Sequence, residues 1–139
     1  MNRKLITPTI LTALFAVITF FWTSCGEPPY AGDITVTEVN MVGALEKTVA
    51  KLEIDGMMCE VGCVAKVKKE LLEQDGVSNV IIDFEKGRKS NFAIVEYDPS
   101  TKDALSLSST ITDIADGKLY GVRAVEVTNY APASSTLAE

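Results

Sequence analysis

Two cysteines, Cys59 and Cys63, lie four positions apart where the sequence changes from a strand pattern to a helix pattern. Residues 49–55 alternate between apolar and polar side chains, which is the period of a half-buried strand. From about residue 60 to residue 74 the apolar side chains recur with the 3.6-residue period of a helix. The two thiols are therefore predicted to lie at the start of a helix, whose partial positive charge stabilises a thiolate.

A pair of thiols in this place has two chemical uses. Thiolates prefer soft ions such as Cu(I) and also bind Zn, whereas two neighbouring thiols can instead form or exchange a disulfide. The chain has no histidine, which excludes imidazole-dependent metal sites and catalysis by Cys-His or Ser-His-Asp groups. No other acid, base or nucleophile system is visible in the sequence, so we expect that the protein is not an enzyme.

The overall charge limits the class of partner. The formal net charge is −6 at pH 7, and no cluster of basic residues interrupts the acidic composition. This balance argues against binding to nucleic acid and against electrostatic attachment to anionic lipid.

The first 24 residues have the layout of a secretory signal peptide. A short basic start precedes an apolar run over residues 11–22, and small residues stand just before Cys25. Residues 22–25 resemble a bacterial lipoprotein cleavage box, although Trp22 stands where leucine is usual. We therefore expect an exported protein, held at the membrane by lipid on Cys25 and facing the periplasm or the cell exterior. Ordinary cleavage nearby and an uncleaved membrane anchor are the alternatives, since the apolar run approaches the ~20 residues that span a bilayer.

The rest of the chain divides into three parts. Residues 25–48 are rich in Gly, Pro, Thr and acidic residues and predict a lipid-anchored tether, with a short extended piece at about residues 34–39. Residues 49–128 carry the periodic patterns of one domain. Residues 129–139 predict a disordered tail.

Four further elements follow the first strand and helix of this domain. They are predicted as a strand at about residues 77–84, a strand at about 91–97, a helix from Ser100 or Thr101 to about Ile114, and a strand at about 120–127. The order strand, helix, strand, strand, helix, strand is that of the ferredoxin-like arrangement. We therefore predict an α+β fold, a ferredoxin-like βαββαβ sandwich with an antiparallel four-stranded sheet and two helices on one face.

Several short motifs point to one known family. They are Ile54-x-Gly56-Met57-x-Cys59 at the thiols, Val67 and Leu71 in the following helix, Gly76-Val77 after it, and Tyr97-Asp98-Pro99 after the third strand. With these motifs, residues from about 49 to 127 resemble the heavy-metal-associated domain of copper chaperones, metal-transport ATPase modules and periplasmic mercury-binding proteins. One feature departs from the family pattern, because three residues separate the cysteines here where two are usual.

The resemblance also implies roles for the neighbours of the thiols. Met57 is expected to point into the core beneath the metal loop, and Met58, at the variable position, is a candidate auxiliary soft ligand. The loop before the last strand approaches the metal loop in this family, so Lys118 could offset the negative charge of a bis-thiolate complex and Tyr120 could lie beside it. A solvated lysine and a core tyrosine are the plainer alternatives for these two residues.

These inferences give two main functional hypotheses. The first is an extracytoplasmic protein that binds a heavy-metal ion through Cys59 and Cys63, with Cu(I) favoured and Zn or Hg as alternatives. It would transfer or sequester the ion, and its partner would be a metal donor or acceptor such as a metal-transport ATPase or an efflux component. The second is a thiol-disulfide redox protein, in which Cys59 is the exposed thiolate and Cys63 resolves the mixed disulfide.

Overall fold

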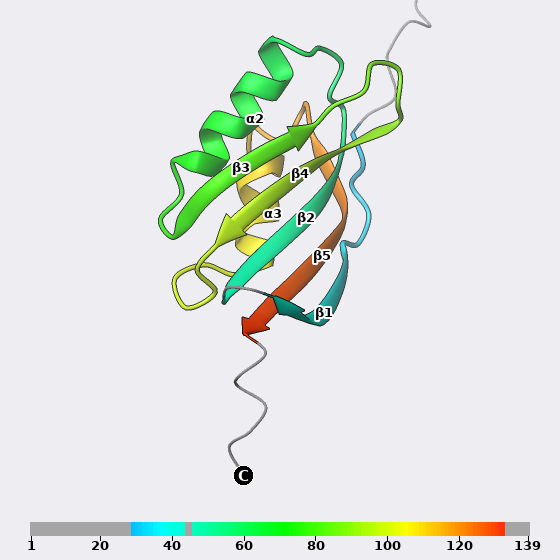
Figure 1. Cartoon of the computed structure of the whole chain (residues 1–139). Helices are drawn as coiled ribbons and strands as arrows, with labels where there is room; N and C mark the ends of the chain where they lie inside the picture. Colours follow the sequence, from blue (N-terminus) through cyan, green and yellow to red (C-terminus); the bar gives the residue numbers. More distant parts are fainter. Residues whose placement is uncertain (1–28, 44–45, 133–139) are drawn as a thin grey trace, which may run out of the picture.

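The computed structural model describes residues 29–43 and 46–132 of the 139-residue chain. Five strands and two helices are found in this part of the chain, and Figure 1 shows their arrangement. In chain order they are β1 (Thr35–Gly43), β2 (Lys47–Asp55), α2 (Gly62–Leu72), β3 (Val77–Asp83), β4 (Ser90–Tyr97), α3 (Ala104–Thr112) and β5 (Gly121–Pro132). No helix among these described residues is long and apolar enough to cross a membrane.

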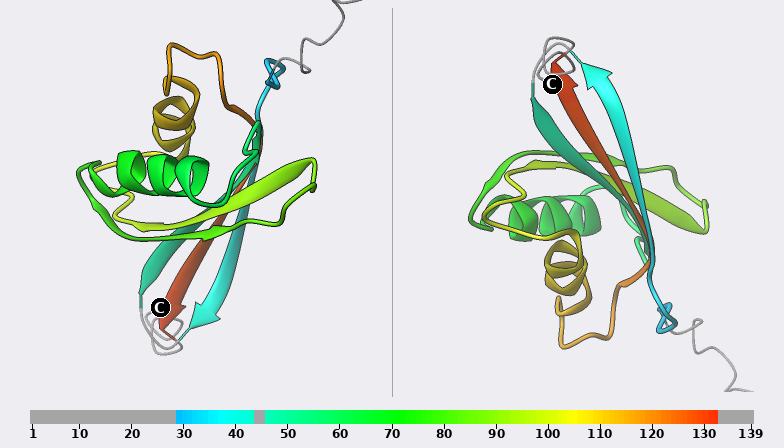
Figure 2. Two further views of the ribbon diagram at one scale, coloured as in Figure 1. Left: turned by 90° about the horizontal axis from the view of Figure 1, so that it is seen from above. Right: turned by 90° about the horizontal axis from the view of Figure 1, so that it is seen from below.

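The strands form one sheet in the order β1-β5-β2-β4-β3. β2 pairs antiparallel with both β4 and β5, and β3 pairs antiparallel with β4. Both helices pack on the same face of this twisted sheet (Figure 2). The α+β fold and its ferredoxin-like βαββαβ order are therefore confirmed for the elements from β2 to β5.

The sheet has five strands, so the predicted four-stranded sheet is corrected. The added strand is β1, which lies parallel to β5 with Thr35 opposite Ala124 and Gly43 opposite Pro132. Its nine residues lie within the segment that we expected to be a tether with a short extended piece. Every residue of β1 before Gly43 is exposed, so the strand is held by backbone hydrogen bonds and leaves no alternation of buried and exposed positions to detect.

The end of β5 also departs from expectation. We predicted a strand to about residue 127 and a disordered tail from residue 129, but β5 continues to Pro132. Its last residues pair with both neighbours, because Asn129 lies opposite Asn40 of β1 and Thr48 of β2. The rest of the predicted tail, residues 133–139, lies outside the described residues.

The hydrophobic core lies between the sheet and the two helices. Apolar side chains of all the strands except β1 meet those of α2 and α3 there, and most of them are buried completely. Burial of this apolar surface contributes most of the stabilisation of such a fold, at roughly 25 cal/mol per Å². The largest of these fully buried apolar residues are Leu52, Ile54, Val67, Leu71, Val80, Val95, Leu107, Ile111, Val122 and Val125.

Both helices are shorter than predicted, and α3 begins at another cap. Asp103 is its N-cap residue, and the Asp103 carboxylate accepts a hydrogen bond from the backbone N–H of Ser106 at 2.9 Å. Ser100 and Thr101, either of which we expected to cap the helix, instead donate to the carboxylate of Asp98 at 2.6 Å and 3.1 Å. Within α3 the hydroxyl groups of Ser108 and Ser109 donate to carbonyl oxygens one turn earlier, which explains how a serine-rich segment stays helical.

Candidate metal centre

The two site cysteines are presented by the connection between β2 and α2, and we call residues 56–61 the thiol loop. Gly56 begins the thiol loop with a φ angle of +90°. A Cβ atom on Gly56 would lie 2.0 Å from the carbonyl oxygen of Leu119, so only glycine fits at this approach. The close contact brings the loop before β5 directly against the thiol loop.

The two thiols are in contact. Cys59 Sγ lies 2.8 Å from Cys63 Sγ, and both cysteines are free, with Cys59 exposed and Cys63 partly buried. Cys59 precedes α2, whose first residue is Gly62, so the three-residue gap is bridged by a turn and not by a continuous helix. A Cβ atom on Gly62 would lie 3.3 Å from Cys59 Sγ, and its absence leaves room for the sulfur. The extra residue between the cysteines therefore does not separate the sulfur atoms.

The sulfur of Cys59 also completes the start of the helix. The N-cap residue Val61 provides no side-chain cap, and the backbone N–H of Cys63 donates to Cys59 Sγ at 3.2 Å instead. A helix start has N–H groups without partners within the helix, and a negatively charged group there is stabilised by the helix dipole. The Cys59 sulfur thus takes the place of a side-chain cap at the start of α2.

The ionisation of Cys63 is set by its surroundings. Burial acts to raise the pKa of Cys63, but hydrogen bonds from the Cys59 side chain, from the Tyr120 hydroxyl and from the Met58 and Cys59 backbone outweigh it. Together they lower the pKa from 9.0 to about 7. Cys63 is consequently ionised more readily near neutral pH than an ordinary cysteine, and a thiolate binds a cation or acts as a nucleophile.

Tyr120 supports this thiolate from the core side. The side chain is 4% exposed, and burial together with its hydrogen bond to Cys63 raises the pKa of Tyr120 well above the ordinary value. The hydroxyl therefore keeps its proton and remains a donor to the sulfur. The structure places Tyr120 beside the site, as the family resemblance implied.

The other residues singled out from the sequence lie in different environments. Met57 is 5% exposed and belongs to the core beneath the thiol loop, whereas Met58 is 84% exposed. The backbone N–H of Lys118 donates to the carbonyl of Ala115 at 3.2 Å, and no contact of its side chain with either thiol is found among the described residues. Cys25 lies outside the described residues.

Two polar groups that support the thiol loop were missed from the sequence. Asn91 is fully buried, and its side-chain amide donates to the Met57 carbonyl while its amide oxygen accepts from the backbone N–H of Glu85. Asp55, just before Gly56, accepts hydrogen bonds from Ser90 at 2.6 Å and from Arg123 Nε at 2.7 Å. Both residues lie in strands with ordinary polar neighbours, so no local pattern distinguishes them.

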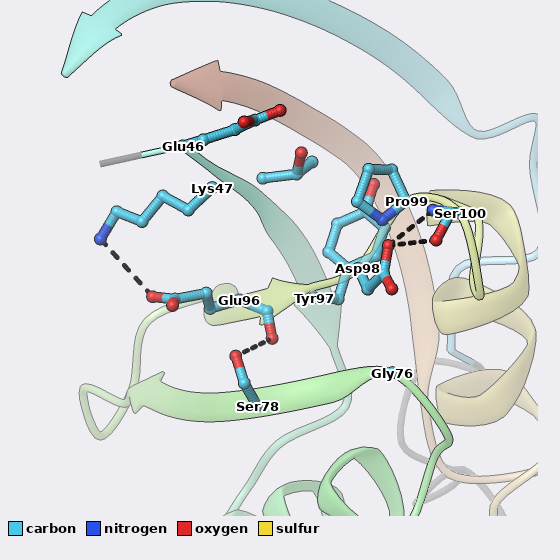
Figure 3. A pocket seen from close by; sticks show the side chains of 10 residues that line it. Glu46, Lys47, Gly76, Ser78, Glu96, Tyr97, Asp98, Pro99 and Ser100 are labelled. Atoms are coloured by element: carbon cyan, nitrogen blue, oxygen red, sulfur yellow. Dashed lines mark hydrogen bonds and ion pairs between the residues drawn. The ribbon is translucent and has the colours of Figure 1, made fainter. Parts of the chain in front are cut away.

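A hollow lies at the end of the sheet opposite the thiols. Figure 3 shows it between the start of β2 and the end of β4, where Lys47 pairs with Glu96, and its volume is about 490 Å³. It contains no cysteine, and no group of three or more Cys, Asp or Glu ligands with metal-binding geometry is found within residues 29–43 and 46–132. The thiol pair is therefore the candidate site.

The arrangement of the thiols permits two kinds of chemistry. Around a tetrahedral ion with metal-sulfur distances of about 2.3 Å, two ligand sulfurs lie about 3.7 Å apart. The sulfurs lie further apart around an ion with fewer ligands, so the pair must open by at least roughly 1 Å from its observed separation. The exposed Cys59 end of the thiol loop can provide this movement. Since the described residues bring only two sulfurs together here, they leave the remaining coordination positions open to an incoming ligand. The same exposure permits thiol-disulfide exchange.

Comparison with known proteins adds two findings. Residues 51–111, less than half of the chain, match the family model of the heavy-metal-associated domain. The crystal structure of oxidized MerP from Ralstonia metallidurans CH34 is similar at 29% sequence identity, with a TM-score of 0.44, and the alignment covers 54% of this chain and 96% of that chain. No curated protein gives a significant match.

Proposed function

We propose that this protein binds one soft heavy-metal ion through Cys59 and Cys63, on the premise that residues 51–111 belong to the heavy-metal-associated domain family. The observation that carries the proposal is the contact of two free thiols at a helix start, with the pKa of Cys63 lowered to about 7. A metal ion needs deprotonated thiols, and this site lowers the cost of deprotonation before the ion arrives.

Cu(I) is the ion we favour. Structural Zn sites hold the ion with four protein ligands, whereas two sulfurs are the only strong ligands that the described residues bring together here. Cu(I) is soft and is stable with few sulfur ligands. Hg shares these properties and is the nearest alternative. Met58 is exposed beside the thiols and could serve as an additional thioether ligand once the ion is bound.

The exposed site suits an exchange of the ion with another protein. Cys59 is accessible to solvent, so an incoming thiolate or thioether can enter the coordination sphere before the first ligands leave. We propose that the protein works outside the cytoplasm, held by lipid on Cys25, and passes the ion to or from a metal transporter or efflux component. Mass spectrometry of the membrane-extracted protein should show a diacylglyceryl group on a chain beginning at Cys25.

The test of metal binding is a competition titration. Fully reduced protein should take Cu(I) from a chelator at one ion per domain, and Cys59→Ser and Cys63→Ser should each weaken binding at least about 100-fold, or about 2.7 kcal/mol. Affinity should also fall as the pH is lowered through about 7, because protons compete for Cys63. The matched control is Val61→Ala, which changes an equally exposed side chain of the thiol loop, retains both thiols and Met58, and should change the affinity far less. Equal affinity of the wild type and the double serine variant would refute the proposal.

A redox function is the second candidate, and one observation favours it. The two free sulfurs are already 2.8 Å apart, so little movement is needed to join them. The lowered pKa belongs to Cys63, which contrasts with the expectation that the exposed Cys59 is the attacking thiolate. A reduction potential measured against glutathione separates the candidates, since a redox protein should equilibrate rapidly with the buffer and retain its turnover in a strong metal chelator.

A further inference from the structure

The first described residues are attached to the end of the domain that carries the thiols. The backbone of Tyr30 lies against Gly121, where a Cβ atom would be 2.0 Å from the Tyr30 carbonyl oxygen. The guanidinium group of Arg123 stacks on the Tyr30 ring, 4.4 Å from its centroid, and the Tyr30 hydroxyl donates to the carbonyl of Asp33 at 2.9 Å. We call the contacts of Tyr30 with Gly121 and Arg123 the Tyr30 latch.

The Tyr30 latch is next to the thiol loop. Gly121 lies opposite Asp55 in the sheet, and the side chain of Arg123 forms an ion pair with Asp55, the residue before Gly56. Figure 1 shows the start of the described chain, in blue, at the same end of the sheet as the connection from β2 to α2. The strand β1 then carries the chain away from this end, parallel to β5.

The distance from the predicted anchor to the Tyr30 latch is short. Only four residues separate Cys25 from Tyr30, and five residue steps of about 3.6 Å span at most about 18 Å even when fully extended. A flexible tether over residues 25–48, as predicted from the sequence, would have allowed the domain any orientation relative to the membrane. Because Tyr30 is already held against Gly121 and Arg123, the four residues between Cys25 and Tyr30 leave the domain little freedom to turn relative to Cys25.

Three exposed apolar side chains lie around the thiols, together with the exposed Glu60. Met58 and Val61 are each 84% exposed, and Leu119, which contacts Gly56, is 50% exposed. Large exposed apolar side chains gathered at one place are typical of surfaces that meet a partner.

From these observations we propose that the thiol end of the domain faces the membrane surface and exchanges its ion with a protein embedded in that membrane. The Tyr30 latch and the short chain before it orient the domain, and Met58, Val61 and Leu119 form the contact around the thiols. The partner is accordingly a membrane protein with thiolate or thioether ligands near the bilayer surface. This inference rests on the proposed function and on the lipid at Cys25.

The orientation is measured on the full lipidated protein in phosphatidylcholine vesicles that contain a lipid with a chelated nickel headgroup, which quenches nearby fluorophores. A fluorophore is attached through Leu119→Cys at the thiol end or through Ser100→Cys at the opposite end, both in a Cys59→Ser, Cys63→Ser background. Quenching should be at least about threefold stronger for the label at position 119, because the nine residues of β2 separate the two ends by about 30 Å.

A linker variant provides the control. Insertion of twenty Gly and Ser residues between Gly26 and Glu27 gives a flexible chain of about 25 Å root-mean-square length, and it should make the two labels equally quenched. Equal quenching without the insertion, stronger quenching at position 100, or a protein that stays soluble because Cys25 carries no lipid would each overturn the proposal. The labelled variants lack both thiols, so this result is independent of metal binding, whose failure would show only in the Cu(I) titration.

Discussion

At the scale of single residues, Tyr120 connects the hydrophobic core to the chemistry of the thiol pair. Its ring is buried among core side chains and its hydroxyl donates to Cys63. A hydrogen bond to an ionised group is stronger than one to a neutral group, so the bond favours the thiolate over the thiol. A core residue thereby lowers the pKa of the Cys63 thiol at the surface without being a metal ligand itself.

Tyr120→Phe should raise the pKa of Cys63 by about one unit, since it removes one donor to the thiolate and keeps the ring in place. A pH titration of thiolate absorbance in the ultraviolet measures the shift, and the pH below which Cu(I) affinity falls should rise with it. Tyr97→Phe is the matched control, because Tyr97 is also a buried tyrosine but lines the hollow at the far end of the sheet. An unchanged thiol titration in Tyr120→Phe would show that the hydroxyl does not act on Cys63.

The sequence could identify residues that belong to a family motif or that carry a reactive group such as a thiol. The cysteines and Met57 were singled out because their spacing matches a known motif, and Tyr120 because the loop before the last strand approaches the metal loop in the family that the chain resembles. Asn91 and Arg123 could not be found this way, because a polar residue in a strand is common and its partners lie 34 and 68 positions away in the chain. Only the folded sheet brings those partners together.

At the scale of elements, Gly56 determines how the thiol loop meets the loop before β5. That second loop turns through Ala115, Asp116 and Gly117, all with positive φ angles, and then places Leu119 against Gly56. Two connections that are distant in sequence therefore pack backbone to backbone, and Tyr120 reaches Cys63 as a result.

Gly56→Ala should lower the free energy of unfolding by about 3 kcal/mol, because the new Cβ atom meets the Leu119 carbonyl in addition to the strain of a positive φ angle. Urea denaturation measures the change. Gly87→Ala is the control, since Gly87 has a similar φ angle of +86° and no atom within 4 Å of an added Cβ, so only the strain of about 1 kcal/mol should appear. Equal losses in the two variants would contradict the role of the Leu119 contact.

The sequence predicted those strands that bury one face against the helices. β2 and β4 bury alternate residues against the helices, and the period of two is visible in their sequences. β1 has no buried face, and its pairing with β5 depends on backbone groups that every residue possesses. Sequence periodicity therefore revealed the four-stranded part of the sheet and missed the strand at its edge.

At the scale of the whole molecule, one charged cluster joins three strands and the N-terminal segment. Asp55 of β2 binds Ser90 of β4 and Arg123 of β5, and Arg123 stacks on Tyr30. Burial acts to raise the pKa of Asp55, but its hydrogen bonds to Arg123 and Ser90 outweigh burial and hold the pKa below the ordinary value. A carboxyl group with a lowered pKa in the folded state stabilises the fold above its unfolded pKa and loses this effect as the pH falls.

Arg123→Gln should lower the melting temperature by about 5 °C at pH 7. The difference from the wild type should shrink as the pH falls below the ordinary carboxyl pKa of about 4, because the stabilisation by the lowered pKa of Asp55 is lost as Asp55 is protonated. Thermal unfolding at a series of pH values measures both effects. In the control, Lys47→Gln removes the exposed pair with Glu96 and should change the melting temperature by less than about 2 °C. A difference between Arg123→Gln and the wild type that stays constant down to pH 3 would exclude the carboxylate as its source.

The position of β5 also determines when the protein can fold. β5 is the last strand in the sequence, yet it lies between β1 and β2 in the sheet, and it joins residues as distant as Asn40 and Asn129, 89 positions apart. Contacts of such high sequence separation form slowly, because long loops must close first. During synthesis β1 and β2 therefore remain without their common neighbour until residues 121–132 emerge. A chain that ends before Gly121 leaves β1 without a partner and one edge of β2 unpaired, and unpaired strand edges promote aggregation.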